Sequence, residues 1–147
     1  MKYFEDAEVG DTFCSETRYC VSADEIKQFA GQWDPQRYHL DEAAAENVVG
    51  ALFAPLVMTM CIAIKLTHTT GFFEIDPVAG LGLEDVRLAK PVLAEDELSV
   101  TVTVVAKRDS NSKPDLGLLT QRTDVFNQNN ELVLSYVIPS LVYKRPR

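Results

Sequence analysis

The segment from Pro55 to His68 constrains the fold more than any other part of the chain. Proline suits the first position of a helix, where its missing N–H would have no partner, and Thr69-Thr70-Gly71 would end the helix. The residues between are apolar on nearly every helical face, which indicates burial on most sides. The sequence therefore predicts a central, buried helix over residues 55–68. Its apolar residues are Leu56, Val57, Met58, Met60, Cys61, Ile62, Ala63, Ile64 and Leu66.

Strand patterns dominate the rest of the chain. Residues 99–104 alternate polar and apolar side chains with a period of two, as in a strand with one buried face. Asn129-Asn130 has the composition of a hairpin turn. An antiparallel sheet of about five strands wrapped around one long helix is an α+β arrangement. The expected strands are residues 12–21, 81–88, 98–107, 116–127 and 131–143.

A short amphipathic helix is expected before the central one. Ser22 and Glu25 fit a capping box, with serine at the N-cap and glutamate three residues later. Apolar residues follow at helical spacing as far as Trp33, so the pattern predicts a helix over residues 23–33 with Trp33 in the core. This helix would place Asp34 in a loop.

Length and composition limit the class of protein. The chain has 147 residues, which suits one domain (residues 1–147) with one hydrophobic core. The apolar content of 46% favours a globular protein. The formal net charge of -8 makes a nucleic-acid partner unexpected, because a phosphate backbone attracts basic proteins.

The sequence also favours a cytoplasmic protein that does not enter the membrane. The longest apolar run, residues 48–64, contains a proline and falls short of the roughly 20 residues that a spanning helix needs. Residues 1–10 do not resemble a signal peptide. Three cysteines without a close pair are expected to be reduced thiols, and two histidines far apart give no support for a metal site. No cofactor is expected.

The candidate chemistry lies in residues 33–41, where Asp34 and His39 are five positions apart in a segment that Pro35 should keep from forming a regular helix. A carboxylate can orient an imidazole, and an imidazole titrates near neutral pH. Such a pair can activate water or move a proton on carbon. Each residue also has a structural alternative: Asp34 as a turn residue, and Gln36 as a donor to the loop backbone instead of the substrate.

The same segment resembles a known family signature. Asp34-Pro35-Gln36-Arg37-Tyr38-His39 is similar to the hydratase signature of the MaoC-like dehydratases, or R-specific enoyl-CoA hydratases. That signature runs Asp, any residue, Asn, Pro, an aliphatic residue, then His, and many members have Gln in the third place, as this chain does. Residues 4–13, 86–92, 107–114 and 125–133 also resemble the family, so the likeness extends over nearly the full chain.

The resemblance implies a hotdog fold, in which a sheet wraps the central helix, and at least a homodimer with active sites near the subunit interface. It implies reversible hydration of a trans-2-enoyl-CoA thioester to the (R)-3-hydroxyacyl thioester. Asp34 and His39 would be the catalytic pair that holds the water, removes its proton and returns a proton to the α-carbon.

The start of the central helix departs from the family pattern. Members commonly have Ser-Gly or His-Gly where Pro55-Leu56 stands, and the glycine amide helps to hold the thioester oxygen. Leu56 keeps its N–H, but its side chain fills space that glycine leaves to the substrate. A smaller acyl pocket, another substrate or lost activity would follow.

Two other functions therefore stay open: a non-catalytic acyl-CoA-binding protein, and a thioesterase. Five basic residues are candidates for contact with the CoA phosphates, against an ordinary solvated surface as the alternative. They are Arg87, Lys90, Lys107, Arg108 and Lys113.

Overall fold

The computed structural model describes residues 1–146. The helices are η1 (Phe4–Asp6), α1 (Ala23–Trp33), α2 (Arg37–Leu40), α3 (Glu42–Val49), α4 (Leu56–Thr67) and η2 (Phe72–Ile75). The strands are β1 (Thr12–Cys14), β2 (Tyr19–Cys20), β3 (Pro77–Gly80), β4 (Glu84–Leu88), β5 (Glu97–Asp109), β6 (Leu116–Phe126) and β7 (Leu132–Tyr143).

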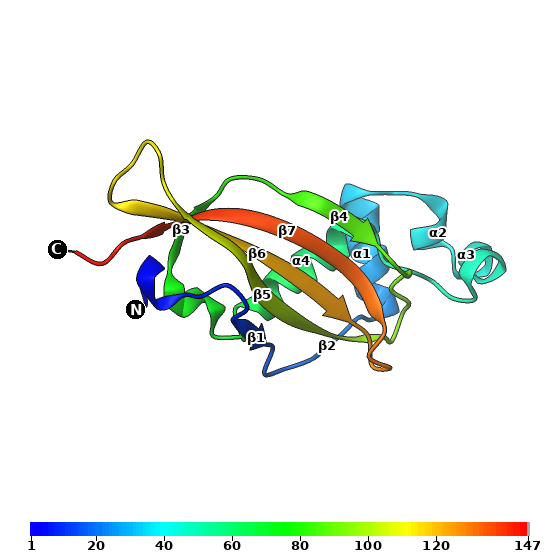
Figure 1. Ribbon diagram of the computed structural model, residues 1–147. Coiled ribbons are helices and arrows are strands. Elements are labelled where there is room, and N and C mark those ends of the chain that lie inside the picture. The colour runs from blue at the N-terminus through cyan, green and yellow to red at the C-terminus, as the bar shows by residue number, and fades with distance from the viewer. Residues whose placement is uncertain (147) are drawn as a thin grey trace.

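The protein has a hotdog fold: an antiparallel sheet curves around α4 (Figure 1). The strand order is β1-β5-β6-β7-β3, with β2 also pairing with β5 and β4 also pairing with β7. The long strands β5, β6 and β7 form its centre, while α1, α2 and α3 gather at one end of the molecule (Figure 1). Both chain ends lie at the opposite end (Figure 1). The predicted α+β hotdog fold is thus confirmed.

The central strands follow the predicted alternation. Val100, Val102 and Val104 on β5 are buried, whereas the residues between them are partly exposed. The predicted turn between β6 and β7 is present, with Asn130 in the left-handed region at φ +58°. Asparagine tolerates that region better than most residues do.

The first strand was predicted as one element over residues 12–21 but forms two, β1 and β2. Ser15 explains the break, because its side-chain oxygen accepts the hydrogen bond of the Val100 N–H at 3.1 Å. A side chain thereby replaces the backbone acceptor, and the chain leaves the ladder after β1. Strand β3 was missed, since Pro77 and Gly80 at its two ends obscure a strand pattern.

Helix α4 begins at Leu56, with Pro55 at the N-cap, and ends before His68. Its sheet-facing side is buried, as predicted. Burial on most sides was wrong for the single chain, because Leu56, Val57 and Ile64 are exposed on the other side. The ring of His68 stacks on Phe73 with 4.1 Å between ring centroids, which gives this histidine a structural contact.

Trp33 was also predicted to be buried, but 68% of this residue is accessible. It is the last residue of α1, and the buried side of that helix consists of Ile26 and Ala30. Apolar spacing marks one face of a helix, but it does not tell at which residue the covering structure ends.

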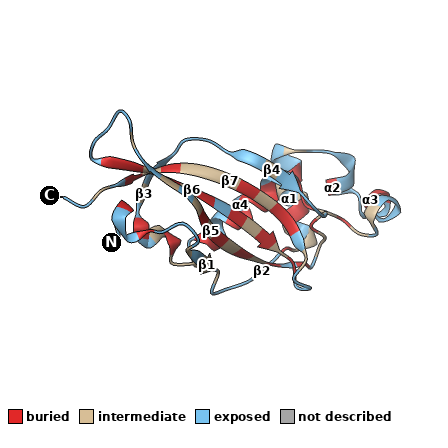
Figure 2. Cartoon of the chain, viewed as in Figure 1, coloured by how far each residue is buried: buried red, intermediate tan, exposed pale blue. Residues whose placement is uncertain are grey.

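The interior consists of two clusters of buried apolar side chains. Figure 2 marks the buried residues in red along the strands and helices. The site-end cluster joins α1 and α4 to the sheet and includes Ile26, Met58 and Tyr136. The terminal-end cluster includes Phe4 and Phe72. Buried polar side chains lie between the two along the strands; they are Gln121, Thr123 and Ser140.

The structure also bears on two further predictions, which concern membrane entry and the cysteines. None of the helices in residues 1–146 combines the length and apolar character required to cross a membrane. The thiols of Cys14, Cys20 and Cys61 are exposed and free.

Candidate active site

Helix α1 is held in place by contacts at its start. The side chain of Ser22 accepts a hydrogen bond from the Glu25 N–H at 3.1 Å, as the capping-box prediction requires. The Glu25 carboxylate, however, accepts a hydrogen bond of 2.6 Å from the phenol of Tyr19. That hydrogen bond, together with burial and the carboxylate charge, raises the pKa of Tyr19 to about 12. Helix α1 is thereby joined to β2.

Asp34 follows α1 directly and leaves the helical conformation, with φ -151° and ψ 74°. Its backbone N–H still donates to the Ala30 carbonyl at 2.9 Å. The segment after Pro35 was predicted to be irregular, yet residues 37–40 form the single-turn helix α2, which carries His39. A proline is compatible with this turn because it precedes the turn and removes no hydrogen bond from it.

The structure brings Asp34 and His39 together. The distance from Oδ2 of Asp34 to Nε2 of His39 is 3.7 Å, which is too long for a direct hydrogen bond. Only 7% of the His39 side chain is exposed, compared with 34% of the Asp34 side chain. The pair is thus open to solvent on the carboxylate side. Gln36 donates a hydrogen bond of 3.0 Å to Oδ1 of Asp34, so its role in the structure is to hold that carboxylate.

The other ring nitrogen of His39 fixes the tautomer. Nδ1 lies 2.8 Å from the carbonyl oxygen of Phe53. A carbonyl can only accept, so Nδ1 must carry a proton in both charge states of the ring. In the neutral ring, Nε2 is then unprotonated and faces Asp34. The ring of Phe53 also packs edge-on against the imidazole, with 4.9 Å between centroids.

The Phe53 carbonyl points at His39 because of how its neighbours pair. The Ala54 N–H donates to the Val92 carbonyl, and the Ala94 N–H donates to the Leu52 carbonyl, both at 2.8 Å. Phe53 and Leu93 form an isolated antiparallel bridge between these bonds. In such a pairing the carbonyl of the middle residue points away from the partner segment. Sequence reasoning missed Phe53, because its partner lies 40 positions further along the chain.

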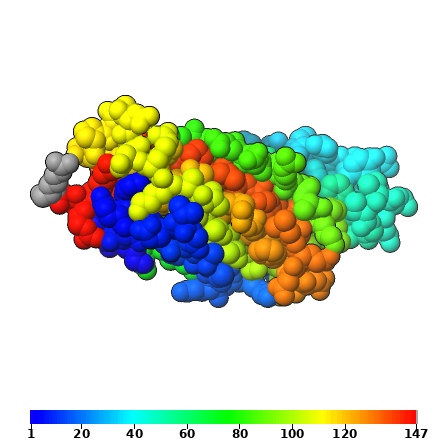
Figure 3. Space-filling view, viewed as in Figure 1, coloured from blue at the N-terminus to red at the C-terminus, as the bar shows by residue number. Residues whose placement is uncertain are grey.

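The same segment leads directly into α4. The first helical hydrogen bond runs from the Thr59 N–H to the Pro55 carbonyl at 3.1 Å. The N–H groups of Leu56, Val57 and Met58 precede that bond, at the positively polarised end of the helix. Leu56 is 37% exposed at this end. All four predicted site residues (Asp34, Gln36, His39 and Leu56) lie between the end of α1 and the start of α4. Helices α2 and α3 within this segment form the protruding end of the molecule that is cyan in Figure 3.

The arrangement provides a base and an acceptor that face each other. An unprotonated Nε2 and a carboxylate oxygen 3.7 Å apart can both accept protons from one small hydroxylic molecule. Within residues 1–146, no group of three or more His, Cys, Asp or Glu side chains lies in an arrangement that could hold a metal ion.

Three of the five predicted phosphate-binding residues are engaged elsewhere. Lys90 pairs with Glu131. Lys107 donates to the Ala7 carbonyl at 2.5 Å and pairs with Glu8. Arg108 donates to the Asp109 carbonyl at 3.1 Å. Arg87 and Lys113 stay candidates.

Comparisons with known proteins show which family this chain resembles. The family model described as "FAS1-like, dehydratase domain region" matches residues 7–136. The chain is 33% identical over 123 residues to the uncharacterized protein YdeM of Bacillus subtilis, covering 83% of this chain and 86% of YdeM. It is 32% identical over 147 residues to the mesaconyl-CoA hydratase of Cereibacter sphaeroides. That match covers 98% of this chain but only 42% of the hydratase.

Among solved structures, the chain is similar to the MaoC-like dehydratase from Rhodospirillum rubrum. The TM-score is 0.89 and the sequence identity is 37%, with 100% of both chains covered.

Proposed function

The chain belongs to the FAS1-like dehydratase-region family of MaoC-like hotdog dehydratases, and on that premise we propose that it hydrates an enoyl thioester of coenzyme A. The reaction is the reversible conversion of a trans-2-enoyl-CoA to the (R)-3-hydroxyacyl-CoA. One observation carries the proposal: a buried imidazole whose Nδ1 is fixed by the Phe53 carbonyl presents Nε2 to the Asp34 carboxylate at 3.7 Å.

Asp34 and His39 hold the attacking water between them. Nε2 of His39 accepts one proton of the water as its oxygen attacks the β-carbon of the substrate, and Asp34 accepts a hydrogen bond from the remaining O–H. The electron pair of the double bond moves toward the thioester, which becomes an enolate. His39 then returns its proton to the α-carbon, so one water is added and no proton is left over.

The enolate oxygen requires hydrogen-bond donors that are already in place. The N–H of Leu56 at the start of α4 is the candidate, because a helix N-terminus favours negative charge. Such donors contribute about 3–4 kcal/mol at comparable sites. The Leu56 side chain limits the room beside this donor and thereby the size of the acyl group.

The partners are the acyl-CoA substrate and further copies of this chain, as a homodimer or a higher homo-oligomer. Exposed apolar side chains on α1, α2, α3 and α4 support self-association. Location in the cytoplasm and the treatment of residues 1–147 as one domain stay predictions. The exposed residues are Trp33, Tyr38, Leu40, Val48, Leu56, Val57 and Ile64.

A non-catalytic acyl-CoA-binding protein is the second candidate. Leu56 is the observation in its favour, because an isobutyl group at the helix start obstructs the position where family members have glycine. The Asp34–His39 geometry argues against it.

The test is the loss of the enoyl-thioester absorbance band when the purified protein meets crotonyl-CoA and longer enoyl-CoAs. We expect the band to disappear without thiol release, and His39→Ala and Asp34→Asn to lower kcat at least about 100-fold. His68→Ala is the matched control, since it removes the other histidine of the chain and should retain activity. Thiol release would identify a thioesterase, and binding of acyl-CoA without turnover would identify the binding protein.

A further inference from the structure

The orientation of His39 depends on a loop that is distant in sequence. The Phe53 carbonyl that accepts from Nδ1 is directed by the pairing of Leu52–Ala54 with Val92–Ala94. Whatever fixes residues 92–94 therefore also fixes the hydrogen-bond acceptor of the imidazole.

The tight turn from Leu93 to Asp96 begins within that pairing. The Asp96 N–H donates to the Leu93 carbonyl at 3.1 Å, and the Asp96 carboxylate accepts from the Leu93 N–H at 2.9 Å through Oδ2. Glu95 inside the turn has φ +74°, a conformation that a residue other than glycine adopts only where its surroundings enforce it. Asp96 is buried, with 7% of the residue exposed. Its side chain thus closes the turn from inside.

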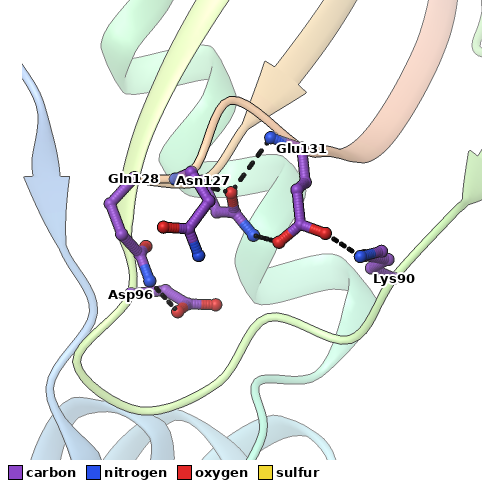
Figure 4. Close-up of polar contacts among 6 residues, drawn as sticks. Lys90, Asp96, Asn127, Gln128 and Glu131 are labelled. Atoms are coloured by element: carbon purple, nitrogen blue, oxygen red, sulfur yellow. Dashed lines mark hydrogen bonds and ion pairs between the residues drawn. The ribbon is translucent and has the colours of Figure 1, made fainter.

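The second oxygen of Asp96 is held by the turn between β6 and β7 (Figure 4). Gln128 donates to Oδ1 of Asp96 at 3.0 Å, while its own amide oxygen accepts from the Glu97 N–H at 3.1 Å. Because both ends of the Gln128 amide are used, its orientation is determined. The carboxylate of Asp96 therefore connects two segments that are more than 30 positions apart.

The β6–β7 turn is itself well fixed. Oδ1 of Asn127 accepts from the N–H groups of Asn129 and Glu131 at 3.0 and 3.1 Å. Glu131 also accepts from Asn127 Nδ2 and pairs with Lys90, as Figure 4 shows. The loop over residues 90–96 is consequently attached to this turn at both of its ends.

We propose that Asp96 is a positioning residue for His39. By joining Leu93 to Gln128 it holds the strand segment that aims the Phe53 carbonyl at Nδ1, and so it selects the tautomer in which Nε2 is free to accept a proton. Its effect on turnover rests on the proposed hydratase function, whereas its effect on the tautomer does not.

The arrangement of donors and acceptors provides a sharp test. In Asp96→Asn, one side-chain oxygen can still accept from Leu93, but the new amide group faces the amide group of Gln128, and two donors meet. The side-chain amide of Gln128 cannot flip, because its NH2 donors would then face the Glu97 N–H. The double variant Asp96→Asn with Gln128→Glu restores the pair, because the asparagine then donates to the glutamate, which still accepts from Glu97.

The direct readout is the tautomer of His39, measured by ¹⁵N NMR of the full-length protein in a His68→Gln background, so that one imidazole remains. Spectra are recorded near pH 9, well above the ordinary histidine pKa of about 6.5. We expect Nδ1–H in the parent, a mixture of the two tautomers in Asp96→Asn, and Nδ1–H again in the double variant. Turnover of crotonyl-CoA should fall about tenfold in kcat in the single variant with KM within about twofold, and the double variant should recover most of it.

Several outcomes would overturn the proposal. An unchanged tautomer in Asp96→Asn would do so whether or not turnover falls, and so would a double variant that does not recover. If Asp96→Asn does not fold, Gln128→Met, at an exposed position, removes the same hydrogen bond by changing its donor. The proposal requires this variant to shift the tautomer of His39. The control is Asp124→Asn, because Asp124 accepts from Ser135 and Arg122 within the sheet and should leave the His39 tautomer unchanged. If the parent shows the Nδ1–H tautomer but no hydration, the proposed function fails while the positioning role stands.

Discussion

The side chain of Gln36 donates a hydrogen bond of 3.0 Å to Oδ1 of Asp34, which leaves Oδ2 of the same carboxylate facing His39 at 3.7 Å. The amide therefore determines which oxygen is available to a water between the pair. Both residues lie in the loop between α1 and α2, where the backbone N–H of Gln36 also donates to the Asp34 carbonyl at 2.8 Å.

We expect Gln36→Leu to lower kcat about fivefold, because the loss of a hydrogen bond to a charged group costs on the order of 1 kcal/mol at a partly exposed site. The measurement is steady-state turnover of an enoyl-CoA. Gln28→Leu, the same change at an exposed position of α1, is the control. Equal kcat values in the two variants would show that the carboxylate does not depend on Gln36.

Leu56→Gly should widen the range of acyl groups. It removes an isobutyl group at the start of α4 and keeps the N–H that is proposed to bind the enolate oxygen. We expect kcat/KM for long or branched enoyl-CoAs to rise at least about fivefold relative to crotonyl-CoA, equal to roughly 1 kcal/mol of relieved crowding. Val57→Gly controls for the helix penalty of glycine, up to about 1 kcal/mol. If both variants change kcat/KM for all substrates by the same factor, the Leu56 side chain does not limit the acyl group.

Gly117→Ala should be strongly destabilising. A Cβ at this position would lie 2.3 Å from the ring of Phe4, which is 6% exposed and packed over β6. Overpacking of this kind costs about 1–3 kcal/mol. Chemical denaturation measures the loss. In Gly31→Ala, where a Cβ meets nothing within 4 Å, the same change in a helix interior should instead stabilise by about 0.5–1 kcal/mol.

A thermodynamic cycle tests the assigned cause. Phe4→Ala removes the ring, so Gly117→Ala in that background should cost much less than it does in the parent. Additive effects of the two changes would contradict the proposed clash.

Arg145→Gln should lower the thermal stability of the protein at neutral pH but not in acid. The hydrogen bond from the Arg145 backbone N–H lowers the pKa of Glu5, and the Tyr3 backbone N–H together with the Arg145 charge lowers the pKa of Asp6. A carboxyl whose folded pKa is depressed stabilises the protein above its unfolded value, here near 4.5 and 3.8, and that stability is lost as the pH falls through the folded value.

The Arg145→Gln change removes the guanidinium but keeps the backbone donor. We therefore expect a lower Tm than in the parent at pH 7, with a difference that shrinks as the pH falls below about 4. Thermal unfolding at several pH values measures this. A difference that stays constant from pH 7 to pH 3 would mean that the two carboxylates are not involved.

Features that depend on neighbouring residues could be predicted from the sequence. The Ser22 cap of α1, the limits of α4 and the alternation on β5 all follow from local chemistry and periodicity. The closeness of Asp34 and His39 followed from a short spacing and a family signature. The roles of these two residues in catalysis stay predictions.

Features that depend on distant partners could not be predicted. The break after β1 arises because the Ser15 side chain replaces a backbone acceptor for Val100, 85 positions away. The carbonyl that fixes His39 belongs to Phe53, an ordinary apolar residue whose orientation depends on Leu93. No periodicity within either segment contains this information.

The position of the two chain ends has a practical consequence. Both lie at the end of the molecule opposite α2 and α3 (Figure 1), beside the terminal-end cluster, and the polar residues Gln121, Thr123 and Ser140 separate that cluster from the site-end cluster. A tag, a fluorescent label or a second protein module fused to either end would therefore be attached far from His39.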